Sequence, residues 1–291
     1  MRLPALHPQS PRRAAMSGPA GATDTALLAW AFCLITLWLV ALWVGPMALD
    51  ALGIALNPHG HHPLHAHGHP FVDARPLLGL PNAMDVLSNL PLALAGAWGS
   101  LALPRRGLPE ATRRAAQVFF AGLLLTGFGS AWYHWAPDPA GLVWDRLGMA
   151  VTFAGALSLA VAERVGQAPA RHTLWVALGL AVVSATLPQL LGNVLPWAVV
   201  QFGGMALIAW AAWQQPAVGA VGVRLGALIG LYALAKVLEL GDAAVFHATG
   251  ELVSGHSLKH LAAACAAWPV LAALRPTRLR QNPAGSGASR A

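Results

Sequence analysis

Charged residues are scarce in this chain. Of its 291 residues only 10% are Asp, Glu, Lys or Arg, whereas 56% are hydrophobic and the mean hydropathy is +0.56. Soluble domains carry about 25% charged residues, so the composition argues against a soluble domain and predicts a polytopic membrane protein. The formal net charge of +7 does not indicate a nucleic-acid partner, because the arginines lie in short loops and tails, where they act as topology signals.

Cysteine is also scarce. The chain has two cysteines, Cys33 and Cys265, and both fall within apolar runs. We interpret them as small buried hydrophobic side chains rather than as a disulfide or a metal-binding pair.

Long apolar runs, by contrast, are abundant. Eight of them reach a length suited to crossing a membrane, for which about 20 residues are needed, and they predict an all-α integral membrane protein. These runs cover residues 26–49, 83–103, 116–135, 142–162, 173–190, 195–213, 224–241 and 256–274. The first run is longer than the hydrophobic region of a signal peptide, about 7–15 residues, and no convincing cleavage site follows it. We therefore expect an uncleaved helix, with cleavage as the alternative.

The arginines alternate between the connections. They precede the first run or follow the second, fourth, sixth and eighth, at positions 12, 13, 105, 106, 113, 114, 164, 171, 224, 275, 278 and 280. The other connections contain almost none, Arg75 being the exception. By the positive-inside rule both termini are cytoplasmic and the arginine-poor loops face outward.

These patterns divide the chain into five segments. The predicted order is a disordered cytoplasmic tail (1–25), an extra N-terminal transmembrane helix (26–49), an outward loop (50–81), a seven-helix core (82–274) and a basic cytoplasmic tail (275–291).

The outward loop contains the segment "NPHGHHPLHAHGHP", residues 57–70, with six of the twelve histidines. Glycine and proline prevent a fixed helix there. A solvated low-complexity loop is the favoured interpretation, and a weak metal-gathering segment is the alternative.

Three clusters of polar residues interrupt the apolar pattern. An ionisable side chain at the bilayer centre costs roughly 2.5–3.5 kcal/mol, so such residues usually face the bundle interior and serve a function. The first cluster is Ser130, His134 and Asp145; the first two are four residues apart and share one helix face. In the second cluster, His256 and His260 have the same spacing, which lets one helix present two imidazoles to one metal.

The third cluster lies near the outer end of the seventh run and comprises Lys236, Glu239, Asp242 and His247. We interpret Lys236 and Glu239 as a structural ion pair. Glu239 or Asp242 is also a candidate for orienting the histidines, as carboxylates often do.

The predicted topology brings these clusters together. The run with Ser130 and His134 points outward and ends there, whereas the runs with Asp145 and with His256 begin at the outer side. Residues far apart in sequence therefore share one membrane depth.

The chemistry that fits this arrangement is a zinc site. Catalytic zinc commonly has three protein ligands and an open fourth position, and His134, His256 and His260 supply three imidazoles. The metal lowers the pKa of its bound water towards about 7. Asp145 is the candidate proton acceptor, and Ser130 the candidate donor to a developing oxyanion. These parts suit the hydrolysis of an amide or an ester.

Other interpretations stay open. A histidine pair four residues apart also suits a buried polar contact or a haem. A transporter would use Lys236, Glu239 and Asp242 as a proton relay, but ionisable groups concentrated at one face favour a site over a path. A lipid receptor without turnover is the third possibility.

Three segments carry a family resemblance. "FVDARPLLGLPNAMDVLSNLPLALAGAWG", "GSAWYHWAPDPAGLVWDRLGMAVTF" and "GHSLKHLAAA" resemble the alkaline ceramidase family, especially its bacterial members, over about residues 71–274. That family belongs to a wider group of seven-helix membrane hydrolases that includes the progestin and adiponectin receptors. The resemblance implies zinc bound by His134, His256 and His260, and catalytic roles for Ser130 and Asp145. It implies hydrolysis of a ceramide amide to a sphingoid base and a fatty acid.

The resemblance has one clear departure, and it also bears on location and substrate. Eukaryotic members have an acidic calcium-binding stretch before the first core helix; Asp73 matches one of its ligands, but the rest of that stretch is absent here. Bacterial members imply an inner-membrane location, with the active site near the outer face and a membrane lipid as substrate. Where ceramide is not abundant, another N-acyl or acyl lipid would be the natural substrate.

Overall fold

The computed structural model describes residues 19–53, 71–103 and 107–274, and within them the secondary structure is helical, without a strand ladder. Six helical segments are long and apolar enough to cross a membrane, which confirms the predicted all-α membrane class. Residues 1–18, the His-rich segment 57–70 and the C-terminal basic tail lie outside the described residues. The prediction of a disordered tail over 1–25 was wrong for residues 19–25, which form the start of a helix.

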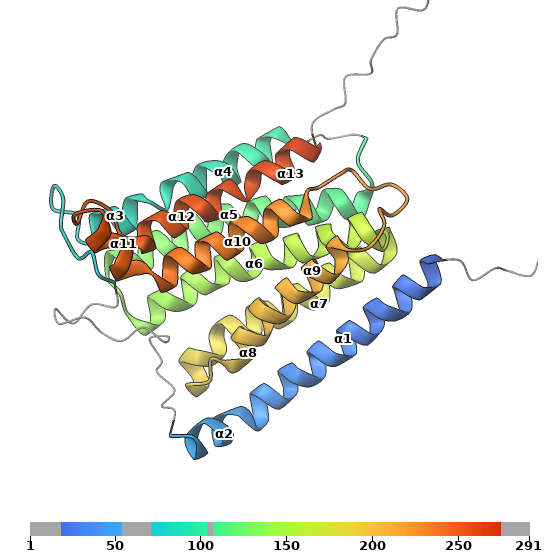
Figure 1. The fold of residues 1–291 in the computed structure, drawn as a ribbon, viewed down its shortest axis with the longest axis horizontal. Coiled ribbons are helices and arrows are strands. Elements are labelled where there is room, and N and C mark those ends of the chain that lie inside the picture. The colour runs from blue at the N-terminus through green and yellow to red at the C-terminus, as the bar shows by residue number, and fades with distance from the viewer. Residues whose placement is uncertain (1–18, 54–70, 104–106, 275–291) are drawn as a thin grey trace, which may run out of the picture.

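The long helices lie side by side and form one bundle (Figure 1). In chain order they are α1 (Pro19–Trp43), α2 (Gly45–Ala51), α3 (Ala83–Leu87), α4 (Leu90–Ala102), α5 (Glu110–Trp135), α6 (Pro139–Arg164) and α7 (Gln167–Leu191). The second half comprises α8 (Leu195–Ala198), the π-helix η1 (Val199–Gly203), α9 (Gly204–Ala212), α10 (Leu225–Leu240), α11 (Asp242–Ala248), α12 (Gly255–Cys265) and α13 (Ala267–Leu274).

Several expected helices are divided. The run at 26–49 is split between α1 and α2 at Pro46, which removes a backbone donor, and α1 begins at Pro19 rather than at residue 26. The run at 83–103 is split into α3 and α4, with Pro91 in the first turn of α4. The segment 243–254, expected to be a turn, contains most of the short helix α11.

Helices α5 and α6 pack in close contact because glycines line their seam. A methyl group on Gly148 of α6 would lie 2.4 Å from the backbone of Thr126 on α5, and one on Gly122 of α5 would lie 2.3 Å from the backbone of Thr152. Small residues let membrane helices approach closely enough for their backbones to touch. The seam continues towards the end of α5 at Gly129, which meets Trp144, and there it sets Ser130 beside the next helix.

A buried carboxylate fastens the loop between α9 and α10. Glu163, only 2% exposed, accepts hydrogen bonds from the backbone N–H groups of Val221, Gly222 and Val223 at 2.8, 2.9 and 3.1 Å. Three charge-assisted bonds satisfy the carboxylate away from water.

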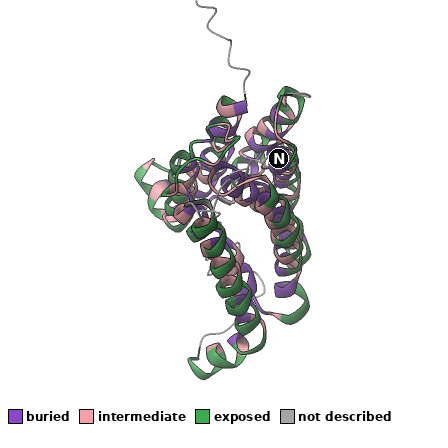
Figure 2. Ribbon diagram, turned by 90° about the vertical axis from the view of Figure 1, so that its right-hand side faces the viewer, coloured by how far each residue is buried: buried purple, intermediate pink, exposed green. Residues whose placement is uncertain are grey.

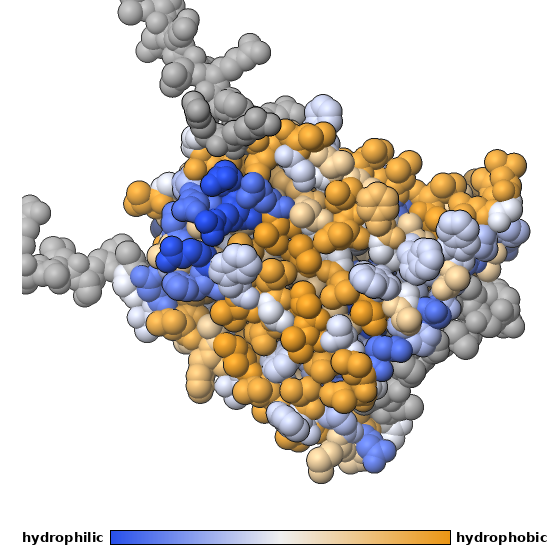
Figure 3. Space-filling model, turned by 180° about the vertical axis from the view of Figure 1, so that it is seen from behind, coloured by the Kyte–Doolittle hydropathy of each residue, from blue (hydrophilic) through white to orange (hydrophobic). Residues whose placement is uncertain are grey.

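Helix α1 lies at the edge of the bundle, beside α7 to α9 (Figure 1), and most of its surface is exposed (Figure 2). Its Trp38 indole N–H donates to the Ser184 hydroxyl of α7 at 2.7 Å. Hydrophobic side chains cover much of the face shown in Figure 3, as a lipid-facing surface requires.

The interpretation of the cysteines as buried was wrong. Cys33 and Cys265 are free thiols, as expected, but both are exposed on the outside of the helices. In a membrane the outer surface of a helix is as apolar as its interior, so hydropathy alone did not distinguish the two positions.

Most of the described arginines lie at the end of the bundle opposite the cluster of His134, His256 and His260; Arg75 and Arg146 are exceptions. Helix α5 begins near Arg113 and Arg114 and ends at His134 and Trp135, whereas α6 returns from Asp145 towards Arg164. Arg224 precedes α10, whose far end leads through α11 to the start of α12, where His256 lies. The polar site is therefore at the end of the bundle opposite these arginines.

Candidate metal centre

Three buried histidines meet at one end of the bundle. His134 of α5 and His256 and His260 of α12 offer ligand atoms that all lie within 4.8 Å of one another. The Nε2 atoms of His134 and His256 are 3.2 Å apart, and the three side chains are at most 4% exposed. The predicted convergence of residues far apart in sequence is confirmed.

A serine fixes the orientation of His260. The Ser88 hydroxyl lies 2.7 Å from His260 Nδ1 and donates to the backbone carbonyl of Asp85 at 3.0 Å. With its own proton committed to that carbonyl, Ser88 accepts from Nδ1–H, which leaves Nε2 of His260 as the free lone pair. Such a bond sets the tautomer and the ring direction of a metal ligand.

The start of α12 is fastened to α3 by a small polar network. Ser254 caps the helix, its hydroxyl accepting from the backbone N–H of Ser257 at 3.0 Å. The Ser257 hydroxyl donates to Asp85 Oδ1 at 2.7 Å, and that of Ser254 donates to the same oxygen at 3.3 Å. The turn that presents His256 is thereby tied to the segment that presents Ser88.

Asp242, at the start of α11, holds both sides of the histidine cluster. Its Oδ1 accepts from the backbone N–H of His256 at 2.8 Å, and its Oδ2 accepts from that of Val72 at 3.2 Å. The neighbouring Phe71 ring, 2% exposed, has its centroid 4.0 Å from that of His256 and 4.5 Å from that of His134. Asp242 thus fixes the main chain of His256, while the orientation of an imidazole by Glu239 or Asp242 stays a prediction.

Ser130 and Asp145 lie beside the cluster. Ser130 is one turn before His134 on α5, and its hydroxyl faces the Asp145 carboxylate of α6. Both are buried and, with His260, they line one cavity of about 160 Å³. Asp145 is not at the start of its helix: α6 begins at Pro139, with Asp138 as the capping residue.

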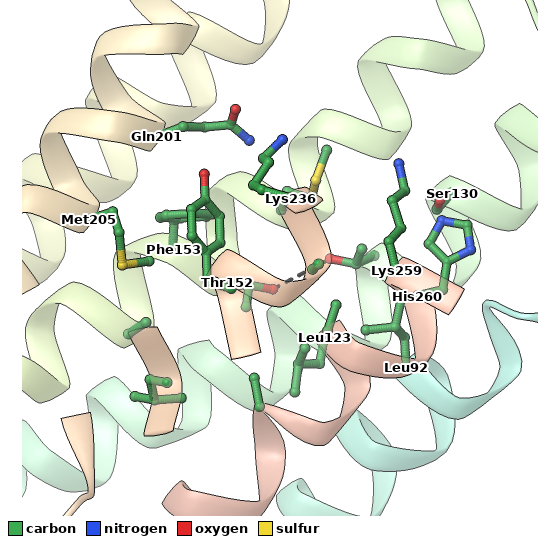
Figure 4. Close-up of a pocket in the computed structure, with 18 of the residues that line it drawn as sticks. Leu92, Leu123, Ser130, Thr152, Phe153, Gln201, Met205, Lys236, Lys259 and His260 are labelled. Atoms are coloured by element: carbon green, nitrogen blue, oxygen red, sulfur yellow. Dashed lines mark hydrogen bonds between the residues drawn. The ribbon is translucent and has the colours of Figure 1, made fainter. Parts of the chain in front are cut away.

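This cavity extends along the bundle from the histidine end. Figure 4 shows Ser130 and His260 at one end of it and Gln201 and Met205 at the other. Most other lining side chains are apolar, among them Leu92. Gln201 belongs to η1, and single π-turns of this kind often occur at functional sites.

The predicted ion pair between Lys236 and Glu239 is confirmed, with Nζ and Oε2 2.5 Å apart. Glu239 also binds Lys259 of α12, whose Nζ is 2.9 Å from Oε1. Both carboxylate oxygens are thus held by lysines. His247 of the same predicted cluster is exposed on α11 and does not belong to the histidine cluster.

The donor set fits a zinc ion. Zinc–imidazole bonds of about 2.0–2.1 Å in a tetrahedron place two nitrogens roughly 3.3 Å apart, close to the 3.2 Å between Nε2 of His134 and Nε2 of His256. Three imidazoles also match the ligand number of catalytic zinc, which keeps an open position. The geometry supports a metal site without specifying which metal it binds.

Asp73, the candidate calcium ligand, is engaged elsewhere. Its two carboxylate oxygens each lie 2.7 Å from nitrogens of the Arg75 guanidinium. Hydrogen bonding to Asp73 raises the pKa of Arg75 above its ordinary value, so the guanidinium stays charged. Calcium would have to displace this guanidinium.

Sequence reasoning overlooked Ser88, Asp85, Phe71 and Lys259. A signal existed for the first two, since "DVLSN" places polar side chains at Asp85, Ser88 and Asn89, one helical turn apart, at the start of an apolar run. Phe71 offered none, because an aromatic residue in a loop is ordinary.

Comparison with known proteins returned no match: no family model, curated protein or solved structure is significantly similar to this chain.

Proposed function

We propose that the protein is a membrane-embedded, zinc-dependent hydrolase of lipid amides, with a ceramidase-like core. One observation carries the proposal: three histidines able to bind a metal, a serine and an aspartate meet at one end of an apolar cavity inside the bundle. A largely apolar cavity between membrane-type helices suits an apolar chain, so an acylated lipid is the proposed occupant.

In the proposed topology all eight predicted runs cross the membrane. α4 and α10, of 13 and 16 residues, span about 20–24 Å at 1.5 Å per residue, and each is continued by its neighbours α3 and α11. Both termini are cytoplasmic, and the histidine cluster lies near the outer face of a bacterial inner membrane. The position of most arginines at the end of the bundle opposite this histidine cluster supports this orientation.

Each residue has a proposed role. A bound Zn²⁺ would polarise a water molecule and lower its pKa towards about 7. Asp145 accepts a proton from the attacking water and returns it to the leaving amine. Ser130 donates a hydrogen bond to the carbonyl oxygen as negative charge develops there. The apolar side chains along the cavity hold the acyl chain and exclude bulk water.

Metal content and product analysis test this proposal together. The purified full-length protein should contain one zinc per chain by mass analysis, and His256→Ala should lose it. Incubation with a mixed membrane-lipid extract and zinc should release a free long-chain amine and a fatty acid. A wild-type protein without zinc under metal-replete conditions would refute the mechanism.

The same site would also suit an ester or another acyl lipid. Only an amidase releases a free amine, so a panel of amide and ester lipids of equal chain length separates the two. Saturable lipid binding without any product would instead indicate a receptor.

A further inference from the structure

Lysine is the rarest positively charged residue in this chain, and its distribution is unusual. The 18 basic residues comprise 16 arginines and only two lysines, Lys236 and Lys259. Both lysines line the cavity described above, and both bind the same carboxylate, that of Glu239. Most arginines lie in loops and at helix ends, Arg146 beside Asp145 being an exception, whereas both lysines lie at the site.

The surroundings make these charges costly. The side chains of Lys236, Lys259 and Glu239 are 30%, 18% and 17% exposed, in a cavity whose lining is largely apolar. Burying an ion pair in such surroundings contributes little to stability, because desolvation offsets the attraction. A structural ion pair needs one lysine, so the second one points to a further role.

Several hydrogen-bond donors on the cavity lining have protons that are not used on Glu239. Each ammonium group has three N–H donors, of which one is used on Glu239. The hydroxyl of Tyr232, also on the lining, is buried without a hydrogen-bond partner. The Gln201 amide lines the cavity as well. A ligand that completes this set brings acceptor oxygens.

The formal charge favours an anion in addition. Two lysines oppose two lining carboxylates, Glu239 and Asp145, while the three imidazoles ligate a metal in their neutral form. A divalent ion at the histidines would therefore leave a surplus of positive charge beside a lining whose own formal charges balance. Unlike an exposed pair, this surplus is poorly screened because the lining is apolar.

We propose that Lys236 and Lys259 bind an anionic group on the amine side of the substrate, so that the preferred substrate is an N-acylated amino acid lipid rather than neutral ceramide. This assignment rests on the proposed function. Water breaks the acyl C–N bond; the acyl carbon keeps the water oxygen and leaves as a fatty-acid carboxylate, and the nitrogen takes both water protons and leaves as the ammonium group of the amino acid.

Lys259 is adjacent to the ligand His260, which sets the direction of the substrate. Figure 4 shows Lys259 and His260 on one helix at the Ser130 end of the cavity. The head group binds at this end, and the acyl chain extends along the apolar lining towards Met205. Glu239 holds the two ammonium groups together, which fixes their spacing.

A matched pair of substrates isolates the charge. N-palmitoylglycine and N-palmitoylethanolamine share the acyl chain and the amide and differ in a carboxylate against a hydroxymethyl group. For the zinc-loaded full-length protein in detergent, we expect kcat/KM to favour the glycine conjugate by at least about tenfold. Ser130→Ala slows turnover without changing the charge of the cavity, so the Kd of each lipid can be measured on this variant. We expect its Kd values to show the same preference for the glycine conjugate.

The variants separate this role from a structural one. The preference ratio is kcat/KM for N-palmitoylglycine divided by kcat/KM for N-palmitoylethanolamine. Lys236→Met and Lys259→Met should each bring this ratio towards unity, and Lys259→Arg should retain it. Glu239→Gln should raise the ratio, because it releases both ammonium groups, and a merely damaged site would not do so. As a control for net charge, Arg171→Met at the opposite end of the bundle, where the side chain is exposed, should leave the ratio unchanged.

Several outcomes would overturn the proposal: a preference for the neutral lipid, or a ratio that both methionine variants leave unchanged. Loss of palmitate binding in those variants at an unchanged substrate ratio would assign the lysines to the product and would also overturn it. If neither lipid is cleaved but the Kd preference and its loss in the variants persist, the proposed hydrolysis fails, while the binding of an anionic group by the two lysines stands.

Discussion

Ser88 offers a sharp test of the candidate metal centre, because one hydroxyl orients one ligand. Replacement of Ser88 by alanine removes the 2.7 Å contact to His260 Nδ1 and leaves the backbone carbonyl of Asp85 without its hydroxyl donor. The imidazole then has a buried N–H with no acceptor and is free to rotate or to change tautomer. Zinc affinity should fall.

The magnitude follows from the cost of the unpaired group. Leaving a buried donor unsatisfied costs about 1–3 kcal/mol, which corresponds to a loss of roughly 5- to 150-fold in affinity. Removal of a group that supports a ligand in this way typically lowers metal affinity or activity by about 10- to 100-fold. We expect a loss in the range where the two estimates overlap, about 10- to 100-fold.

Competition with a chelator of known affinity measures this change in purified protein. Ser100→Ala is the matched control, since the Ser100 hydroxyl of α4 donates only to the carbonyl of Gly96 in its own helix. A Ser88→Ala protein with zinc affinity within twofold of Ser100→Ala would refute the role assigned to Ser88. So would equal loss in both variants, which would indicate general damage to the bundle.

The remaining predictions concern stability, followed by thermal unfolding in detergent. Gly148→Ala should destabilise the protein by about 1–3 kcal/mol, because its new methyl group meets backbone atoms. Gly179→Ala, with open space around it, should leave the stability unchanged or raise it by up to about 1 kcal/mol. Equal effects of the two substitutions would refute the close packing of α5 against α6. Glu163→Ala should lower the free energy of unfolding by about 3 kcal/mol or more, because it leaves three N–H groups unpaired. Glu110→Ala, which removes an exposed ion pair, should change it little. Trp38→Phe should cost about 1 kcal/mol through the lost indole bond to α7, and an unchanged unfolding temperature would show that α1 is not anchored there.

The sequence predicted that the site residues share one membrane depth, because the presence or absence of arginine assigns each loop to one side of the membrane. Once the direction of each helix was assigned, Ser130, His134 and His256 had to lie near one face. The contact among the histidines followed from two pairs of polar residues at helical spacing, and the structure confirms it.

Other features depend on tertiary contacts that leave little trace in a single sequence. The break between α3 and α4 lies inside an apolar run, yet it is what places Ser88 against His260. Glu239 was predicted to pair with Lys236, but its second partner, Lys259, comes from another helix. A hydropathy pattern carries no information about which faces of two helices meet.

Phe71 and Asp242 bear on how quickly a metal enters and leaves. Phe71 packs against two of the three imidazoles, and the backbone of the next residue is tethered to Asp242. An ion bound there would be covered on one side by this short segment, so its dissociation on that side would require the segment to move as well as the metal–nitrogen bonds to break. Dilution or a weak chelator would then remove the metal slowly even where equilibrium favours its release, and the occupancy of the protein would reflect the history of its assembly.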